Sequence, residues 1–273
     1  MLGGLERKVA CDAVCSRILE ARLSQFERRP GDQGGGQRKD ALVRLPGASR
    51  YRFVAGSPRG RLVLFQGPVF SCGSASFAPD TGSGESFLTW DGSQYLAHRS
   101  EGGHSDFAPT DEHQIRLLHF LLPRFGHVGV EHVWSGFGVP NIYEFLCDEE
   151  DILEQPEIAQ LIESAKDHSK AIVDAAFDPQ HPSELCLATV DLLVSILASE
   201  AGNLGLKALA TGGVYLSGGI ALHLVKLLQK QQFVQTFTRK GRFKDLMERV
   251  AIHIITTRAA LLGAATFPTA EVE

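Results

Sequence analysis

Two consecutive strand-then-helix units near the C-terminus constrain this chain more than any other feature. Residues 212–229, GGVYLSGGIALHLVKLLQ, indicate a strand, a double glycine and a helix, and residues 250–267, VAIHIITTRAALLGAATF, repeat a strand and a helix. Strands that alternate with helices predict an α/β domain whose ligands bind at the carboxyl ends of the strands. The long apolar segment of residues 182–209 predicts a helix that is buried on more than one face.

Further strands and helices are predicted before these units. Residues 61–70 indicate a buried strand, and residues 85–99 indicate two strands joined by a turn at DGSQ, a hairpin signal. Helices are predicted over residues 111–126 and 151–176. Between them, a further helix is predicted to begin after the glycine-rich turn of SGFGVPNIYEFL. Residues 5–28 have helical periodicity, whereas residues 29–60 predict a linker or disorder.

Charge divides the chain near residue 70. Residues 1–70 contain 13 Lys and Arg against 6 Asp and Glu, and the remaining residues contain 14 against 26. A basic segment can bind nucleic acid, but this Gly/Arg/Pro-rich segment lacks the regular aromatic spacing of nucleic-acid modules. We therefore expect a poorly ordered basic segment over residues 1–61, a folded domain over residues 62–273, and no nucleic-acid partner.

The composition excludes several classes of protein. Hydrophobic residues make up 44% of the chain and charged residues 22%, which indicates a globular rather than a disordered protein. No stretch approaches the roughly 18 consecutive apolar residues of a membrane span, and the first residues lack a secretory pattern. Five scattered cysteines favour reduced thiols. We expect a cytoplasmic protein that does not bind a membrane.

Three glycine-rich turns offer sites for chemistry. In SEGGHSDFAP, residues 100–109, Glu101 and His104 could exchange hydrogen bonds with a polyol, or the segment could be a solvated turn. DTGSGE, residues 80–85, could bring backbone N–H groups and a hydroxyl to a phosphate, or form a plain β-turn. LSGGI, residues 216–220, stands at a strand-to-helix turn that favours anions, with a tight connection as the alternative.

Glu131 is a further carboxylate, placed just before the glycine turn of GVEHVWSGFG. By itself it indicates a surface or capping residue. The sequence contains no nucleophile elbow and no G-x-x-x-x-G-K-[ST] phosphate loop. From the residues alone, we infer an α/β domain that binds a phosphate or a polyol.

The order of these segments resembles the C-terminal large domain of bacterial-type glucokinases. EGGHSDFAP, FGHVGVEHVWSGFGVPNIYEFL, GGVYLSGGI, KGRF and LLGAA follow one another between about residue 70 and residue 267. The resemblance implies a ribonuclease-H-like domain of the actin-like ATPase superfamily, an α/β fold with a mixed sheet flanked by helices, after an irregular N-terminal segment. It also implies an ATP- and Mg²⁺-dependent hexose kinase that phosphorylates glucose at the entry to glycolysis and forms a homodimer.

The same resemblance assigns roles to single positions. It implies that Glu101, His104 and Glu131 bind glucose hydroxyls, and that the domain holds no structural metal. The positions with implied nucleotide contacts are Thr81, Gly82 and Gly84 on the phosphate turn and Gly218 and Gly219 on the adenosine-side turn.

The sequence departs from the family pattern in two respects. The family's D-x-G-G-T-[NK] hairpin and its N-D-F segment, whose Asp is the general base, have no counterpart, so no catalytic residue is assigned. Asp80 stands where the family has a glycine. A carboxylate about 4 Å from a phosphate oxygen costs on the order of 4 kcal/mol at an effective dielectric constant of about 20. Three alternatives stay open: an active glucokinase, a non-catalytic sugar-binding or regulatory relative, and a truncated glucokinase fragment.

Overall fold

The structure is a computed structural model. It describes residues 54–57, 61–65, 74–79, 83–90, 95–149 and 152–255. Two predicted helices, over residues 5–28 and after residue 255, and the hairpin turn at residues 91–94 lie outside the described residues.

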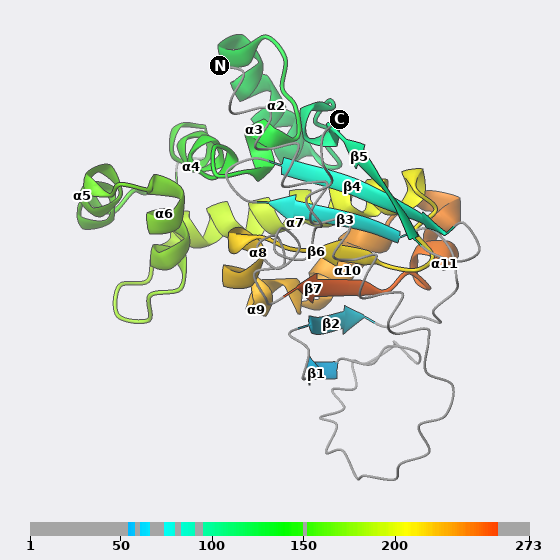
Figure 1. The fold of residues 1–273 in the computed structure, drawn as a ribbon. Coiled ribbons are helices and arrows are strands. Elements are labelled where there is room, and N and C mark those ends of the chain that lie inside the picture. Colours follow the sequence, from blue (N-terminus) through cyan, green and yellow to red (C-terminus); the bar gives the residue numbers. More distant parts are fainter. Residues whose placement is uncertain are drawn as a thin grey trace, which may run out of the picture.

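A mixed sheet organises the described part of the chain, with its seven strands in the order β1-β2-β7-β6-β3-β4-β5 (Figure 1). The consecutive strands β3, β4 and β5 form an antiparallel meander, and β6 and β7 continue the sheet parallel to β3. Beyond β7, β2 and then β1 are added antiparallel. The strand bounds are β1 Val54–Ser57, β2 Arg61–Phe65, β3 Ser74–Pro79, β4 Ser83–Trp90, β5 Tyr95–Ser100, β6 Val214–Leu216 and β7 Ile252–Ile255.

The predicted strands are confirmed, with one correction. The hairpin of β4 and β5 and the strands β2, β6 and β7 lie where the sequence indicated them. The linker expected over residues 29–60 is wrong for Val54–Ser57, which forms β1. That short segment, VAGS, has little β propensity of its own, and it becomes a strand through backbone pairing with β2.

Helix α7, Glu184–Lys207, is the central helix of the fold. It begins after Ser183, whose hydroxyl accepts the Cys186 N–H, and it packs against α4, α6, α10 and the strand β3. By length and composition α7 could cross a membrane, but 78% of its most apolar stretch is buried inside the fold. Its apolar character is therefore that of a core helix, as the sequence predicted.

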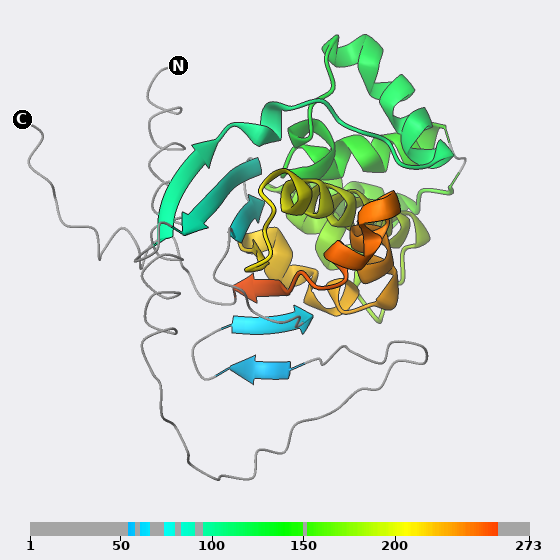
Figure 2. The same cartoon turned by 90° about the vertical axis from the view of Figure 1, so that its right-hand side faces the viewer.

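The described helices lie on one side of the sheet (Figure 2). Residues 151–176, expected to be helical throughout, form two helices, because Asp167 caps a new helix through the Lys170 N–H. The remaining bounds are η1 Gly102–His104, α2 Glu112–Phe125, α3 Glu131–Trp134, α4 Gly138–Asp148, α5 Pro156–Ser164, α6 His168–Ala176, α8 Gly219–His223, α9 Val225–Leu228, α10 Gln231–Thr238, η2 Gly241–Phe243 and α11 Lys244–Met247.

Candidate functional site

One row of paired residues crosses four neighbouring strands near the carboxyl ends of β3, β5 and β6. Ser100 of β5 pairs with Glu85 of β4, Glu85 pairs with Phe77 of β3, and Phe77 pairs with Leu216 of β6. Because β3, β5 and β6 run in the same direction, their carboxyl ends lie at the same edge of the sheet. Ligands of open α/β sheets bind at such an edge.

The three glycine-rich turns leave the sheet from this row. The turn that carries Glu101 and His104 follows β5, the predicted phosphate turn joins β3 to β4, and the predicted adenosine-side turn follows β6. Gly84 lies buried in β4, opposite Ala78. Three residues of the phosphate turn, Asp80, Thr81 and Gly82, lie outside the described residues.

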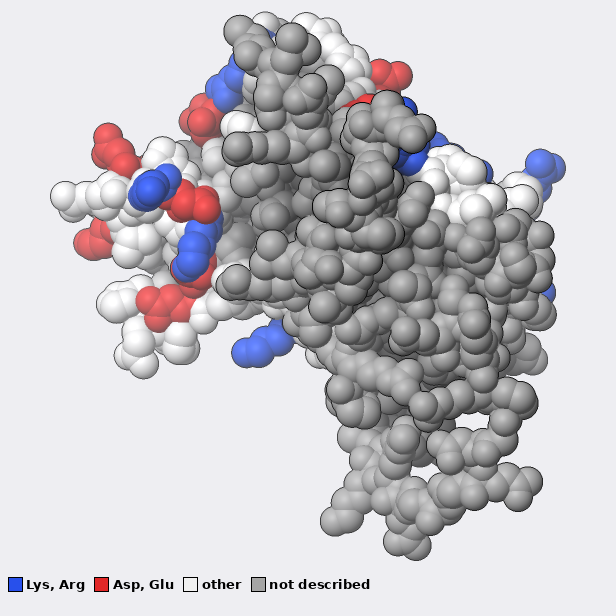
Figure 3. Space-filling model, viewed as in Figure 1, with Lys and Arg blue, Asp and Glu red and all other residues white. Residues whose placement is uncertain are grey.

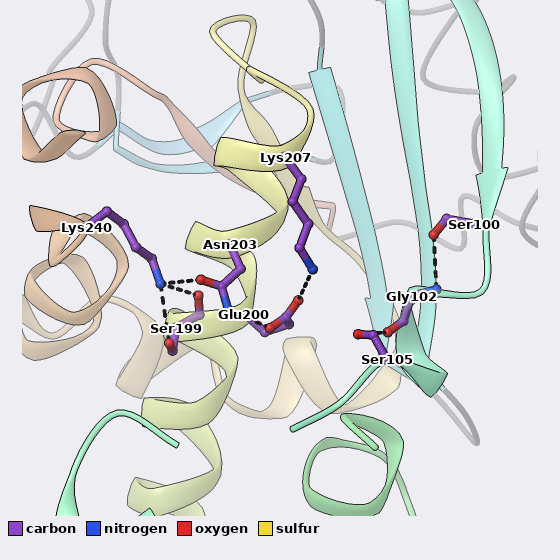
Figure 4. A network of polar contacts seen from close by, with 8 residues as sticks. All are labelled: Ser100, Gly102, Ser105, Ser199, Glu200, Asn203, Lys207 and Lys240. Carbon is purple, nitrogen blue, oxygen red and sulfur yellow. Dashed lines mark hydrogen bonds and ion pairs between the residues drawn. The ribbon is translucent and has the colours of Figure 1, made fainter. Parts of the chain in front are cut away.

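The first turn is held by its own backbone and by two serines. Gly102 N–H donates to Ser100 Oγ at 3.0 Å, and Ser105 Oγ donates to the Gly102 carbonyl at 2.6 Å (Figure 4). The His104 N–H closes the turn on the Glu101 carbonyl at 3.0 Å. The side chains of Glu101 and His104 are exposed, so both are available to a ligand.

Backbone pairing brings Glu131 to this turn, although 30 positions separate it from Glu101. The Phe107 N–H donates to the Val128 carbonyl at 2.9 Å, and the Val130 N–H donates to the Ser105 carbonyl at 2.9 Å. Glu131 is the next residue and begins α3. The structure therefore gathers the three predicted sugar-binding residues on two segments that are bonded to each other.

His132 is a member of this cluster that the sequence reasoning missed. Its Nδ1 accepts the Gly129 N–H at 3.0 Å, which requires that nitrogen to be unprotonated. Burial lowers the pKa of His132, with the neighbouring Glu131 acting in the opposite direction and His104 in the same one. The only sequence signal was its position directly after Glu131.

Helix α3 is short, and polar side chains fix both its backbone and the turn after it. Ser135 Oγ donates to the Glu131 carbonyl at 2.7 Å, and the buried Asn141 donates to the His132 carbonyl at 2.8 Å. A methyl group at Gly138 would lie 2.5 Å from the Val133 carbonyl carbon, so only glycine fits there. These contacts hold the Glu131 backbone in place.

A pocket of about 180 Å³ opens beyond this turn. Gly136, after α3, and Gly219, after β6, both line it, and so do polar side chains of α6 and α8. The Ser169 hydroxyl donates to the Gly136 carbonyl and joins α6 to the glycine turn. The polar side chains that the sequence reasoning missed in this lining are Asp167, Ser169, Lys170 and His223.

Gly218 makes a sharp turn directly before Gly219, which lines this pocket. Its backbone has φ 101° and ψ 166°, a region that is essentially restricted to glycine. This conformation turns the chain from β6 directly into α8, so that Gly219 is exposed at the pocket.

Charged side chains near the pocket have mixed signs. Lys170 forms an ion pair with Asp174, and His223 Nδ1 lies 4.0 Å from the same carboxylate. Over α5 and α6, acidic and basic side chains are interspersed on the face drawn in Figure 3. The described residues around the pocket therefore carry charges of both signs.

Lys240, from the KGRF segment, has a structural role. Its Nζ donates to the Ser199 carbonyl at 2.9 Å and to Asn203 Oδ1 at 2.7 Å, and burial lowers its pKa (Figure 4). A methyl group at Gly202 would lie 2.6 Å from Lys240 Cε, so α7 carries a glycine where this side chain crosses it.

Comparison with known proteins identifies relatives of this chain. The glucokinase from Trichormus variabilis is 41% identical over 198 residues, which cover 68% of this chain and 57% of that protein. The glucokinase from Synechocystis sp. is 35% identical over 216 residues, covering 74% and 61%. The chain thus spans about three fifths of the length of these relatives.

Solved structures show the same fold. The glucokinase from an Antarctic psychrotroph superposes with a TM-score of 0.63 and 26% identity, covering 77% of this chain and 62% of that one. The glucokinase from Balamuthia mandrillaris, solved in complex with glucose, gives a TM-score of 0.64 at 19% identity, covering 75% and 57%. The α/β fold is that of the actin-like ATPases. The Glucokinase family model matches residues 71–271, and the chain belongs to the glucokinase family.

Proposed function

We propose that the chain binds glucose and ATP as the large domain of a glucokinase and serves phosphoryl transfer from ATP to the 6-hydroxyl of glucose. The observation that carries the proposal is the row of paired residues from Ser100 to Leu216. Three segments leave the sheet from this row: the turn that carries Glu101 and His104, the predicted phosphate turn and the predicted adenosine-side turn. The glucokinase from Balamuthia mandrillaris was solved with glucose bound, which supports the same substrate here.

On the sugar side, Glu101, His104 and Glu131 bind the hydroxyl groups. Carboxylates accept hydrogen bonds, and an imidazole can donate one and accept another, so this set matches hydroxyl groups that do both. Burial lowers the pKa of His132 and so favours its neutral form, in which Nδ1 accepts the Gly129 N–H. We assign it to holding the Glu131 segment in place.

On the nucleotide side, the pocket beside Gly219 holds the adenosine, and the phosphates extend towards Thr81, Gly82 and Gly84. Gly136 and Gly219 line this pocket, and because glycine has no side chain a nucleoside could lie close against the backbone there. ATP, when bound, supplies the phosphoryl group. Among the described residues no group of three or more His, Cys, Asp and Glu could hold a metal, so we propose that Mg²⁺ enters with the phosphates.

Transfer also needs a base within hydrogen-bond reach of the sugar hydroxyl, and no residue of this chain matches the family's general-base Asp. One alternative is a sugar-binding relative that does not transfer phosphate. Titration calorimetry with glucose, run beside a coupled ATP and glucose assay, separates the two. Turnover contradicts the non-catalytic alternative, and glucose binding without turnover supports it. Absence of glucose binding contradicts both.

The role of Glu131 can be tested directly. We expect Glu131→Gln to weaken glucose binding more than ATP binding, because the amide keeps the size but loses the charged acceptor. Equal losses for both ligands would instead make Glu131 a structural residue. The matched control is Glu163→Gln on the exposed surface of α5, which should change neither affinity.

The family resemblance also supports a homodimer and a cytoplasmic location. Both remain predictions for this chain. Sedimentation velocity at several protein concentrations tests the first, and a monomer throughout would contradict it.

A further inference from the structure

A buried carboxyl group lies directly beneath the turn that carries Glu101 and His104. Glu85, on β4 opposite Ser100 of β5, has only 3% of its surface exposed. A methyl group added at Gly102 would lie 1.8 Å from Glu85 Oε2 and 2.5 Å from its Cδ. The carboxyl group therefore fills the space that a side chain at position 102 would need, and it supports the turn from below.

Glu85 is the buried acidic member of a small set of groups that hold Gly102. The other two, Ser100 and Ser105, bind the N–H and the carbonyl of Gly102 through their hydroxyl groups (Figure 4). Glu85 Oε1, in contrast, is buried and forms no hydrogen bond with the residues that the structure describes. A buried polar atom without a partner is costly, and its retention calls for a functional reason.

Charged groups of α7, Glu200 and Lys207, act electrostatically on Glu85. Glu200 is 6% exposed, and its Oε1 lies 3.6 Å from Lys207 Nζ, while Asn203 donates to its second oxygen at 2.8 Å (Figure 4). Lys240 reaches the same part of α7 through Asn203. The turn itself adds two titratable side chains, Glu101 and His104, and both are exposed to solvent.

Two buried carboxyl groups that repel each other cannot both carry a charge at low cost. Burial and the charge of Glu200 raise the pKa of Glu85 to about 7, and Lys207 offsets only part of this rise. Near neutral pH, Glu85 therefore changes from a neutral group that packs against Gly102 to an anion that lacks a hydrogen-bond donor on Oε1.

We propose that Glu85 is a positioning residue for the sugar: its carboxyl group, packed against Gly102, sets the conformation of the turn that presents Glu101 and His104. The sugar part of this inference rests on the proposed glucose binding, whereas the control of the turn does not. Glu85 acts through the turn and touches no substrate.

The test compares the wild-type chain with Glu85→Gln, Glu85→Ala and the exposed control Glu163→Gln. Hydrogen exchange of the peptide that spans residues 100–106, corrected for intrinsic rates, measures the turn, and calorimetry measures glucose affinity. We expect Glu85→Ala to speed exchange of this peptide and to weaken glucose binding, each by about tenfold. Glu85→Gln keeps the size of the neutral acid and should restore wild-type behaviour at about pH 6.

The pH profile separates positioning from simple packing. Between about pH 6 and about pH 8, exchange of this peptide should rise by about tenfold in the wild-type chain and stay level in Glu85→Gln. If Glu85→Ala does not fold, as far-UV circular dichroism would show, the Glu85→Gln profile still decides the matter. Profiles that are identical in the wild-type chain and in Glu85→Gln overturn the proposal.

The two proposals fail in different ways. If Glu85→Gln loses the pH-dependent exchange but the wild-type chain does not bind glucose, Glu85 still supports the turn and the proposed function is wrong. If the wild-type chain and Glu85→Gln bind glucose with the same affinity at both pH values, the proposed function is unaffected. Glu85 then has no role in positioning the sugar.

Discussion

Phe77 of β3 lies directly beside Leu216 of β6 in a parallel register. The segments that follow these two residues therefore leave the sheet in the same direction, and they are the predicted phosphate turn and the predicted adenosine-side turn. More than a hundred positions separate them in the sequence. Their proximity is a property of the sheet.

Gly218→Ala should destabilise the fold by about 1 to 3 kcal/mol, because φ 101° with ψ 166° is a conformation that alanine rarely adopts. Urea denaturation measures this cost. The neighbouring Gly219→Ala is the control, since Gly219 is the first residue of α8 and its φ is not positive. Alanine there should be neutral or slightly stabilising. Equal losses in both variants would contradict the backbone explanation.

The sequence predicted the order of strands, turns and helices well, because that order follows from local patterns. Alternation and turn residues marked the β4–β5 hairpin, and β6 with its double glycine stood out as an apolar strand before a helix. The short strand β1 and the break before α6 were missed. The first depends on pairing with β2, and the second on a single capping residue, Asp167.

The candidate site was only partly visible in the sequence. Glu101, His104 and Glu131 could be named through motifs, but their proximity depends on the bonds between residues 105–107 and residues 128–130. Glu85 offered no signal as a support of the turn. Its packing against Gly102 joins β4 to the turn after β5, and the residue that raises its pKa by charge, Glu200, lies on α7, far away in the sequence.

Glu85 should also make stability depend on pH. Its pKa is about 7 in the fold against the ordinary 4.5 of a glutamate in water, so between these values the folded chain holds a proton that the unfolded chain has lost. The unfolding free energy therefore falls as pH rises through this range and levels off above about pH 7. The expected loss between about pH 5 and about pH 8 is on the order of 2 to 3 kcal/mol.

Urea denaturation of wild type and Glu85→Gln at these two pH values checks this expectation. The Gln variant should lose this component of the pH dependence and be the more stable protein at the higher pH. Glu163→Gln should follow the wild-type curve, because its side chain is exposed on α5. A wild-type slope that persists in Glu85→Gln would assign the titration to another group.

Lys240→Met should destabilise the fold by about 2 to 3 kcal/mol. The change keeps most of the aliphatic stem but leaves the Ser199 carbonyl and Asn203 Oδ1 without their charged donor. The matched control is Lys244→Met on α11, whose exposed pair with Glu248 at 3.9 Å should contribute less than about 0.5 kcal/mol. Chemical denaturation of both variants gives the comparison. Equal stability in the two variants would show that the Lys240 contacts add nothing to the fold.

Gly129→Ala should weaken glucose binding while leaving nucleotide binding nearly unchanged. A methyl group at Gly129 would lie 3.3 Å from the Ser105 carbonyl oxygen, which is closer than nine in ten such contacts, and 3.4 Å from the His104 carbonyl oxygen. The strain has to be relieved by separating the segment before Glu131 from the turn that carries His104. We expect a loss of about three- to tenfold in glucose affinity by calorimetry. The residues that line the pocket beside Gly219 include none from positions 101–131, so ATP affinity serves as the internal control. A parallel loss of both ligands would mean that the substitution disturbs the whole edge of the sheet, and unchanged glucose affinity would show that the two segments need not stay together to bind the sugar.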